Sequence, residues 1–286
     1  ARTTSACPNS IISAALAGLG GALYYCVQTF LLASNSDPEV YSYFFGGWNA
    51  TDFRPVVGIE YRIDLLNGLV LIVIAAVALL AAIFSKQFVP RETPGKEPQY
   101  YTLFLLLAVG LMGMTITSDA FNLYVLLEVS SLTSYALIAM GSRRAAVAAY
   151  QYVIMGTIGA SFYLLGVGYL YIKTGSLNMV EIHNILLTKG LHDSPAVYVA
   201  FILIFAGIWI KLAFFPLSSW LPNAYSRAPT TTGCIVAPLM TKVSVYILLR
   251  FMFTLFRPEF SAEWFNEPSQ PKPVHDDNPA MVRIHE

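Results

Sequence analysis

The fold is decided by a continuous apolar run, LLNGLVLIVIAAVALLAAIF, which occupies residues 65–84. No charged residue interrupts this run. A helix rises about 1.5 Å per residue, so a run of this length extends about 30 Å, which is the thickness of the hydrocarbon core of a bilayer. Lipid offers no hydrogen bonds, so the backbone groups of the run must pair with one another. The run therefore predicts a membrane-spanning helix.

Windows of similar length and character recur along the chain, at residues 10–32, 63–84, 100–117, 119–140, 150–172, 197–216 and 232–256. They lack the alternating pattern of barrel strands. We expect an all-α polytopic membrane bundle of about seven transmembrane helices, one of them broken. The first window follows Arg2, as the core of a signal sequence would, but it is longer than a usual signal core, which favours a true span.

The composition excludes several other classes of protein. Hydrophobic residues make up 56% and charged residues 12% of the chain, against roughly 45–50% and 25% in globular proteins. Lys and Arg together number 17, as do Asp and Glu, so no basic excess is available for nucleic acid. Cys7, Cys26 and Cys234 lie far apart and form no metal-binding or disulfide pattern. We expect no cofactor, no metal site and no redox chemistry within this chain.

Three charged residues lie in the middle of apolar windows: Glu128, Lys211 and Lys242. An isolated charge at that depth costs between about 3 and more than 10 kcal/mol, so such residues are retained where they pair or line a wet cavity. One interpretation is a buried Glu–Lys pair that only fixes helix packing, with the second lysine reaching an interface. The other is a proton path, in which movement of the carboxylate relative to a lysine switches that lysine between holding and releasing a proton.

Prolines interrupt the helices that carry the two lysines. The segment after Lys211 reads FFPLSSWLP, and Pro216 removes one backbone hydrogen bond there. Discontinuous helices mark ion sites in transporters, so Pro216 predicts a helix break beside the lysine. Pro238 precedes Lys242 by one turn and could break its helix as well, although a simple kink is the commoner outcome.

The other polar and aromatic residues have simpler interpretations. The small polar residues around Glu128 serve either helix packing or water binding; they are Asn122, Ser130, Ser131, Thr133 and Ser134. His183 and His192 are expected on a solvated loop, and Asp64 and Asp119 as helix N-caps. Aromatic belts at the membrane interface are expected to contain Trp48, Tyr100, Tyr101, Trp220 and Tyr225.

Several stretches resemble one family. Residues 209–229, WIKLAFFPLSSWLPNAYSRAP, resemble the broken-helix signature of antiporter-like subunits, which Mrp-type cation/proton antiporters share with complex I and membrane-bound hydrogenases. DAFNLYVLLE at 119–128 is similar to the family's glutamate helix, and TKVSVYILLR at 241–250 to its lysine helix. Further motifs are most similar to the D-type subunits of Mrp-type antiporters; they are GGW at 46–48, GIEYR at 58–62 and QYVIMGTIGA at 151–160.

The resemblance implies a role for each charged residue. Glu128 would modulate the lysine, Lys211 would carry the proton, and Lys242 would pass charge toward the centre of the protein. It also implies flanking helices over residues 1–99 and a five-helix proton-channel repeat over 100–257. The polar, proline-rich composition of residues 258–286 predicts a disordered tail. Complete members of the family resemble two inverted repeats, and this chain matches one of them.

The leading hypothesis is a membrane subunit of an Mrp-type monovalent cation (Na⁺)/proton antiporter, integral to a bacterial or archaeal membrane. Its partners would be the other subunits of a multisubunit membrane complex, the lipid bilayer, protons and monovalent cations, and it would not be an enzyme. The first alternative is a proton-translocating module of a redox enzyme of the complex I or membrane-bound hydrogenase type. The second is a structural half-subunit that conducts nothing.

Overall fold

The computed structural model describes residues 8–35, 40–47, 58–141, 144–191 and 194–256, with the side chains of Pro8 and Asn9 left aside. The sequence-based expectations for Cys7, Trp48, His192 and the tail over 258–286 lie outside the described residues.

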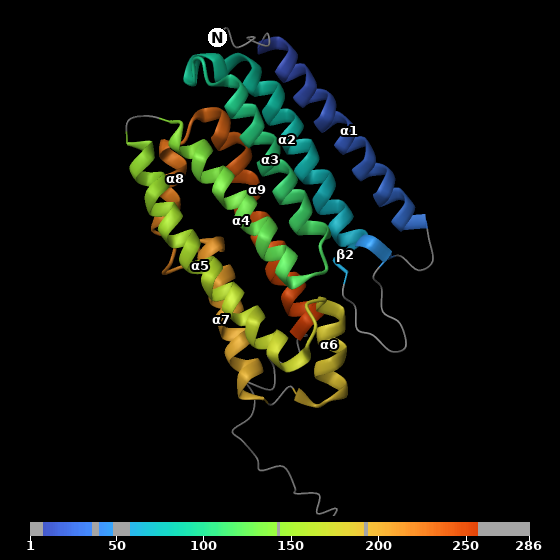
Figure 1. Cartoon of the computed structure of the whole chain (residues 1–286). Coiled ribbons are helices and arrows are strands. Elements are labelled where there is room, and N and C mark those ends of the chain that lie inside the picture. The colour runs from blue at the N-terminus through green and yellow to red at the C-terminus, as the bar shows by residue number, and fades with distance from the viewer. Residues whose placement is uncertain (1–7, 36–39, 48–57, 142–143, 192–193, 257–286) are drawn as a thin grey trace, which may run out of the picture.

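Long helices dominate the described chain (Figure 1). They are α1 (Pro8–Asn35), α2 (Leu65–Glu92), α3 (Glu97–Ile116), α4 (Ala120–Ala139), α5 (Ala145–Thr174), α7 (Pro195–Leu212) and α9 (Thr230–Arg250), the last continuing as the π-helix η3 (Phe251–Phe256). Each of these 7 helices is long and apolar enough to cross a membrane. All of the predicted windows overlap one of them, so the all-helical membrane bundle is confirmed.

Shorter elements join the spans. They are β1 (Tyr41–Phe44), a 3₁₀ turn (Phe45–Gly47), β2 (Glu60–Ile63), α6 (Met179–Thr188) and α8 (Trp220–Arg227). The two strands form an antiparallel hairpin in which Tyr41 pairs with Ile63. The hairpin lies at the same end of the bundle as the junction between α3 and α4 (Figure 1), and the backbone N–H of Ser118 donates to the carbonyl of Glu60 at 2.9 Å.

The expected N-caps are present. Asp64 and Asn67 form a reciprocal capping box at the start of α2, with N···O distances of 3.0 and 2.8 Å. Asp119 accepts the backbone N–H of Asn122 at 2.6 Å at the start of α4. Burial raises the pKa of the Asp119 carboxyl above its usual value, because desolvation penalises the charged form. Both aspartates therefore satisfy backbone donors that the first turn of a helix leaves unpaired.

The segment between α5 and α7 differs from the expected solvated loop, because it contains α6. Asn178 caps this helix by accepting the backbone N–H groups of Val180 and Glu181 at 3.0 and 3.1 Å. Met179, Ile182, His183 and Leu186 recur at three- and four-residue spacings and form its buried face. The prediction of a surface His183 is wrong: this side chain is 4% exposed, and its Nδ1 lies 2.8 Å from the carbonyl oxygen of Leu255.

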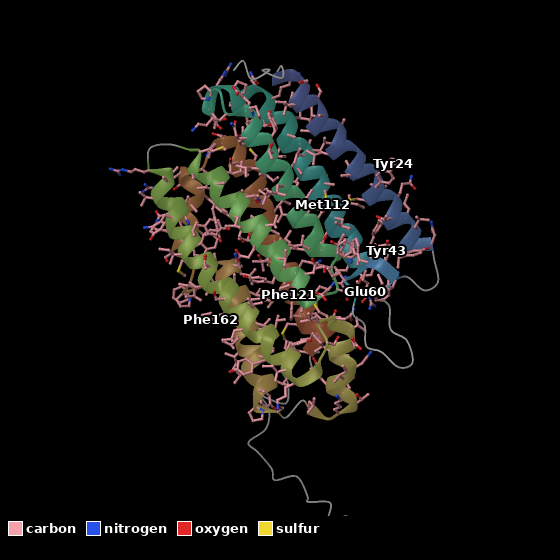
Figure 2. The ribbon with its side chains drawn as sticks, in the orientation of Figure 1. Tyr24, Tyr43, Glu60, Met112, Phe121 and Phe162 are labelled. Carbon is pink, nitrogen blue, oxygen red and sulfur yellow. The ribbon has the colours of Figure 1, made fainter. Side chains whose placement is uncertain are left out.

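The outside of the bundle is apolar, as expected of a surface that meets lipid. Figure 2 labels Tyr24, Phe121 and Phe162, which are 60%, 45% and 39% exposed. An apolar surface of this extent is unfavourable in water. The chain is an integral membrane protein, and the apolar side chains cover its lipid-facing surface.

Close helix contacts in the interior depend on glycine. Gly159 and Gly207 face one another across α5 and α7, and a Cβ at position 207 would lie 2.5 Å from the carbonyl oxygen of Gly159. Lipid tails are as apolar as leucine, so burial does not drive spans together and small residues at the contact provide packing instead. The two glycines therefore set how closely α5 and α7 approach.

We expect Gly207→Ala to destabilise the protein by about 1–3 kcal/mol, because the added methyl group forces these backbones apart. The measurement is thermal unfolding of the detergent-solubilised protein. Gly168→Ala is the control on α5, because a Cβ at position 168 meets nothing within 4 Å and alanine favours a helix over glycine by roughly 0.5–1 kcal/mol. Equal melting temperatures for the two variants would contradict the packing argument.

Candidate functional site

Lys211 is the most deeply buried basic side chain that the sequence singled out. It occupies the last turn of α7 and is 7% exposed. Its Nζ donates to the Ser131 hydroxyl at 2.6 Å and to the Tyr135 hydroxyl at 3.4 Å. The ammonium also lies 5.9 Å from the centre of the Tyr135 ring. A charge buried in this way is costly unless hydrogen bonds compensate it, and α4 supplies these bonds.

Glu128 lies on the same face of α4 as the two hydroxyls, because residues 128, 131 and 135 are three and four positions apart. Its side chain is half-buried, and Oε1 is enclosed without a hydrogen-bond partner in the described chain. Within the described residues the only ion pair closer than 4.0 Å joins Arg250 to Asp64, so Glu128 and Lys211 form no direct ion pair. The direct partners of the Lys211 ammonium are therefore the hydroxyls of the α4 face that also carries Glu128.

Tyr135 was not predicted from the sequence, and Ser131 was expected only to serve helix packing or water binding. The Ser131 hydroxyl donates to the carbonyl of Leu127 at 2.7 Å, so its oxygen is free to accept from the lysine. The spacing from Glu128 was the available signal for both residues. Ser130, Thr133 and Ser134 instead bond carbonyls of their own helix, and Ser130 packs against Gly110, so helix packing accounts for them.

The helix that carries Lys211 ends one residue later. Ala213 has a left-handed backbone with φ 53°, and a cis peptide bond joins Phe215 to Pro216. The break therefore starts before Pro216, which lies within the turn that leads to α8. The break removes the helical hydrogen bond that the carbonyl of Ile210 would otherwise accept from the residue four positions later. This carbonyl instead accepts the backbone N–H of Ala213 at 3.1 Å and the indole N–H of Trp220 at 3.2 Å.

Aromatic side chains pack behind the lysine. Tyr135 meets Tyr152 edge-on at 4.4 Å, and Tyr152 stacks on Trp220 at 4.2 Å between ring centres. Trp220 is 4% exposed, and Tyr100 and Tyr101 are 0% and 4% exposed, so the prediction of an interfacial belt is wrong for these three. In a membrane bundle the interior is as apolar as the lipid, and composition does not distinguish the two locations.

Lys242 lies apart from the other two predicted residues. Its side chain is exposed on the outer face of α9, where Nζ donates to the carbonyl of Ala237 at 2.9 Å. Pro238 does not break its helix: α9 is continuous from Thr230 to Arg250. The proline removes one hydrogen bond, while Ile235, Val236 and Leu239 pack this stretch into the core. Within the described chain, Lys242 is not part of the Lys211 cluster.

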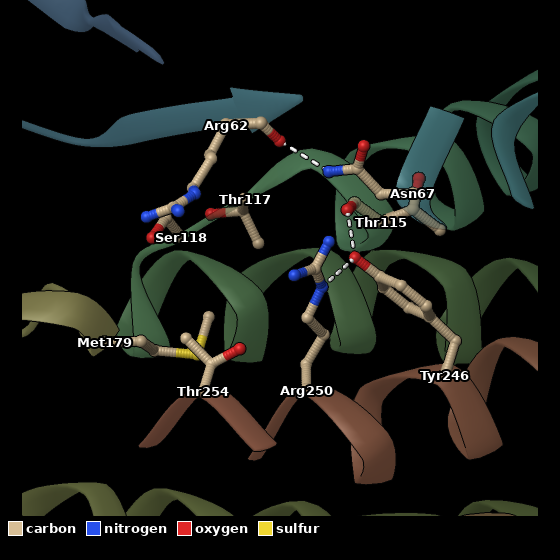
Figure 3. Close-up of a pocket in the computed structure, with 9 residues that line it drawn as sticks. All are labelled: Arg62, Asn67, Thr115, Thr117, Ser118, Met179, Tyr246, Arg250 and Thr254. Carbon is tan, nitrogen blue, oxygen red and sulfur yellow. Dashed lines mark hydrogen bonds between the residues drawn. The ribbon is translucent and has the colours of Figure 1, made fainter. Parts of the chain in front are cut away.

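A second polar cluster lies at the ends of α2, α3 and α9 (Figure 3). The Arg250 guanidinium pairs with Asp64 at 2.5 Å and donates to the Tyr246 hydroxyl at 2.6 Å, and this hydroxyl donates to the carbonyl of Thr115 at 2.8 Å. The cluster borders a cavity of about 50 Å³. These contacts tie three spans together at one end of the bundle.

The sequence matches one family model. The model, described as "NADH:quinone oxidoreductase/Mrp antiporter, TM", matches residues 117–267, which is more than half of the chain. Among curated relatives, "NADH-quinone oxidoreductase subunit N" of Desulforudis audaxviator is 44% identical over 85% of this chain. "Putative antiporter subunit mnhD2" of Staphylococcus haemolyticus is 36% identical over 74% of this chain. The chain spans 46% and 41% of the lengths of these two relatives.

Solved structures show the same fold. The archaeal respiratory membrane complex called membrane-bound sulfane sulfur reductase contains a chain with a TM-score of 0.75 and 29% identity, over 91% of this chain and 50% of that one. The Mrp complex from Dietzia sp. DQ12-45-1b contains one with a TM-score of 0.75 and 26% identity, over 87% and 45%. Both similar chains are subunits of multisubunit membrane complexes.

Trp220→Phe tests how α8 is held beside the broken helix. The phenyl ring keeps part of the stacking on Tyr152 but removes the indole donor, while the Ile210 carbonyl keeps its bond from the Ala213 N–H. We therefore expect a loss of about 0.5–1.5 kcal/mol in stability. Thermal unfolding in detergent measures it. Trp209→Phe is the control, because Trp209 is 37% exposed and stacks on the exposed Phe214. A Trp220 variant as stable as the control would show that the indole bond contributes nothing.

Proposed function

The chain belongs to the NADH:quinone oxidoreductase/Mrp antiporter family of membrane subunits, and from this membership we propose that it serves in a multisubunit monovalent cation (Na⁺)/proton antiporter. In this role residues 100–257 form one proton half-channel, and the flanking helices within residues 1–99 support it. The relative named as a putative antiporter subunit and the similar chain of the Mrp complex support this choice.

One observation carries the proposal: neutral hydroxyls hold the buried Lys211 ammonium, and they share a face of α4 with Glu128, whose Oε1 is enclosed without a hydrogen-bond partner in the described chain. Packing alone favours a direct ion pair, since separating two buried charges forfeits their attraction. Proton transfer requires the opposite, because a lysine tied permanently to a carboxylate holds its proton too firmly. In the proposed path Glu128 tunes Lys211, and Lys211 carries the proton at the depth of the helix break.

Lys242 has the third position in this path. Its exposed ammonium lies on the outer face of α9, so it would exchange protons with a neighbouring part of the complex rather than with Lys211 directly. The chain spans less than half the length of the two curated relatives, and complete transport by this chain alone is not proposed. Pro216 lies in the turn that forms the break, whereas Pro238 has no part in the path.

The specific observation that favours a second function is the relative named as a subunit of NADH-quinone oxidoreductase, at 44% identity. In a redox complex the same residues would move protons, and electron transfer in other subunits would supply the energy. Purification of the native complex distinguishes the two roles. Iron–sulfur, flavin or nickel subunits in stoichiometric amounts would favour the redox complex, and a complex without them would favour the antiporter.

Neutralising Lys211 tests the proton path. In the assembled complex, in inverted membrane vesicles, we expect Lys211→Ala to slow sodium-dependent proton movement by about 100-fold or more, the usual range for removal of a proton-transfer group. A fluorescent pH indicator follows the exchange. Glu128→Gln should slow it less, because the lysine remains.

The matched control is Lys173→Ala, which removes the same charge from an exposed position in the last turn of α5. It should leave the rate unchanged. Normal exchange by Lys211→Ala, in a complex that assembles normally, would remove the proton-carrying role of this lysine. If the Glu128/Lys211/Lys242 triple neutral variant also exchanged at the normal rate, the chain would be a structural subunit.

A further inference from the structure

Lys211 has two sets of possible partners on one face of α4. Glu128 lies three residues before Ser131 and seven before Tyr135, which places the carboxylate about 4.5 Å and 10 Å further along the helix axis. The ammonium donates to both hydroxyls and not to the carboxylate. The hydroxyls therefore provide a binding position for the ammonium that is distinct from a position at the carboxylate.

We propose that Ser131 and Tyr135 are positioning residues that give the Lys211 ammonium a second binding position, away from Glu128. The ammonium then alternates between these hydroxyls and the carboxylate. The inference rests on the proposed function, because it describes how the same lysine would take up and release its proton. Neither residue takes a proton in this scheme. They decide where the lysine is when it gives one up.

The chemistry of the two positions differs. A carboxylate stabilises the charged form of an amine far more than neutral hydroxyls do. Hydroxyl oxygens accept hydrogen bonds from the ammonium, so they compensate desolvation without fixing the charge. The lysine therefore keeps its proton beside Glu128 and releases it more readily beside Ser131 and Tyr135.

The hydroxyl position is built by several elements rather than by α4 alone. A Cβ at Gly156 of α5 would lie 1.7 Å from the Tyr135 hydroxyl and 3.4 Å from the Lys211 Nζ. Only glycine leaves room for both groups. Tyr152 packs edge-on against the Tyr135 ring, and the Ser131 hydroxyl is oriented by its own bond to Leu127. The position is enclosed, oriented and fitted to an ammonium.

Movement between the positions requires only the side chain. The indole of Trp220 bonds the carbonyl of Ile210, which directly precedes the lysine, so the backbone there is fixed. The four-carbon stem of lysine is flexible enough to reach partners one turn apart. The helix break therefore holds the base of the side chain while its ammonium moves.

The titratable groups that face this lysine are few. Glu128 and Tyr135 come from α4, Tyr152 of α5 lies behind Tyr135, and Tyr225 of α8 lies beyond Trp220. Of these groups Glu128 is the carboxylate, and no ion pair within 4.0 Å joins it to Lys211 in the described chain. A change in the pH profile after a Tyr135 substitution would therefore report the balance between hydroxyl and carboxylate positions.

Tyr135→Phe is the principal test, in the whole complex in inverted vesicles, with proton movement driven by sodium or by electron transfer according to the complex. Without the hydroxyl the lysine spends more time at Glu128 and keeps its proton to higher pH. We expect the pH–rate profile to shift to alkaline pH by about half a unit or more, with a maximum rate several-fold lower. Tyr152→Phe makes the same change in the same aromatic cluster without contact to Lys211, and should leave the profile in place.

Two further variants separate positioning from damage to the fold. Gly156→Ala should displace the Tyr135 hydroxyl and give the same alkaline shift, while Gly168→Ala on the same helix should not. In a Glu128→Gln background the competing carboxylate is absent, so Tyr135→Phe should no longer shift the profile. If Gly156→Ala does not assemble, Tyr135→Phe still decides, because it adds no atoms.

The inference and the proposed function fail in different ways. If Lys211→Ala abolishes proton movement but Tyr135→Phe keeps the normal profile, the positioning role is wrong and the proton path stands. Equal shifts in Tyr135→Phe and Tyr152→Phe would also overturn the positioning role, since they would report disturbed packing. Normal movement in Lys211→Ala would overturn the proton path itself.

Discussion

The structure depends on one constraint: a lysine ammonium has to be kept in an interior from which water is largely excluded. Lys211 is 7% exposed, and a charge without partners at that depth would cost several kcal/mol. Hydroxyls on α4 compensate it, and glycine on α5 leaves the space in which they can do so. The break after Leu212 ends the helix beside the charge, and the indole of Trp220 donates to the Ile210 carbonyl at the break.

The same constraint explains how the neighbouring helices are built. In lipid, burial of apolar side chains does not drive helices together. Small residues at the contacts between spans allow the helices to approach closely and pack. Gly159 and Gly207 bring α5 against α7, and Gly110 brings α3 against Ser130 of α4. Close packing fixes α4, α5 and α7 in register, so the hydroxyls and the ammonium meet at bonding distance. At one end of the bundle the Arg250–Asp64 pair and the bond from Tyr246 tie α9 to α2 and α3.

The spans, and the positions of the charges within them, could be predicted from the sequence because each depends on a local cost; the roles of Glu128, Lys211 and Lys242 in a proton path stay predictions. An apolar run has to be a helix in lipid, and a mid-span charge is retained only where it is compensated. The same reasoning failed for residues whose location depends on which side of a helix faces inward. His183 and Trp220 are buried although a surface was expected, and Lys242 is exposed although it lies in mid-span. Hydropathy does not separate a lipid-facing surface from an equally apolar interior.

The sequence by itself determined the class of protein, the approximate spans, the caps at Asp64 and Asp119, and that Glu128 and Lys211 are charged residues within apolar spans. Each follows from residues within a few positions of one another or from the energy of a single buried charge. Only the tertiary structure decided that Lys211 bonds Ser131 and Tyr135 rather than Glu128, across 80 and 76 positions of sequence. That choice depends on the rotation and register of separate helices, which side-chain packing fixes and no local pattern encodes.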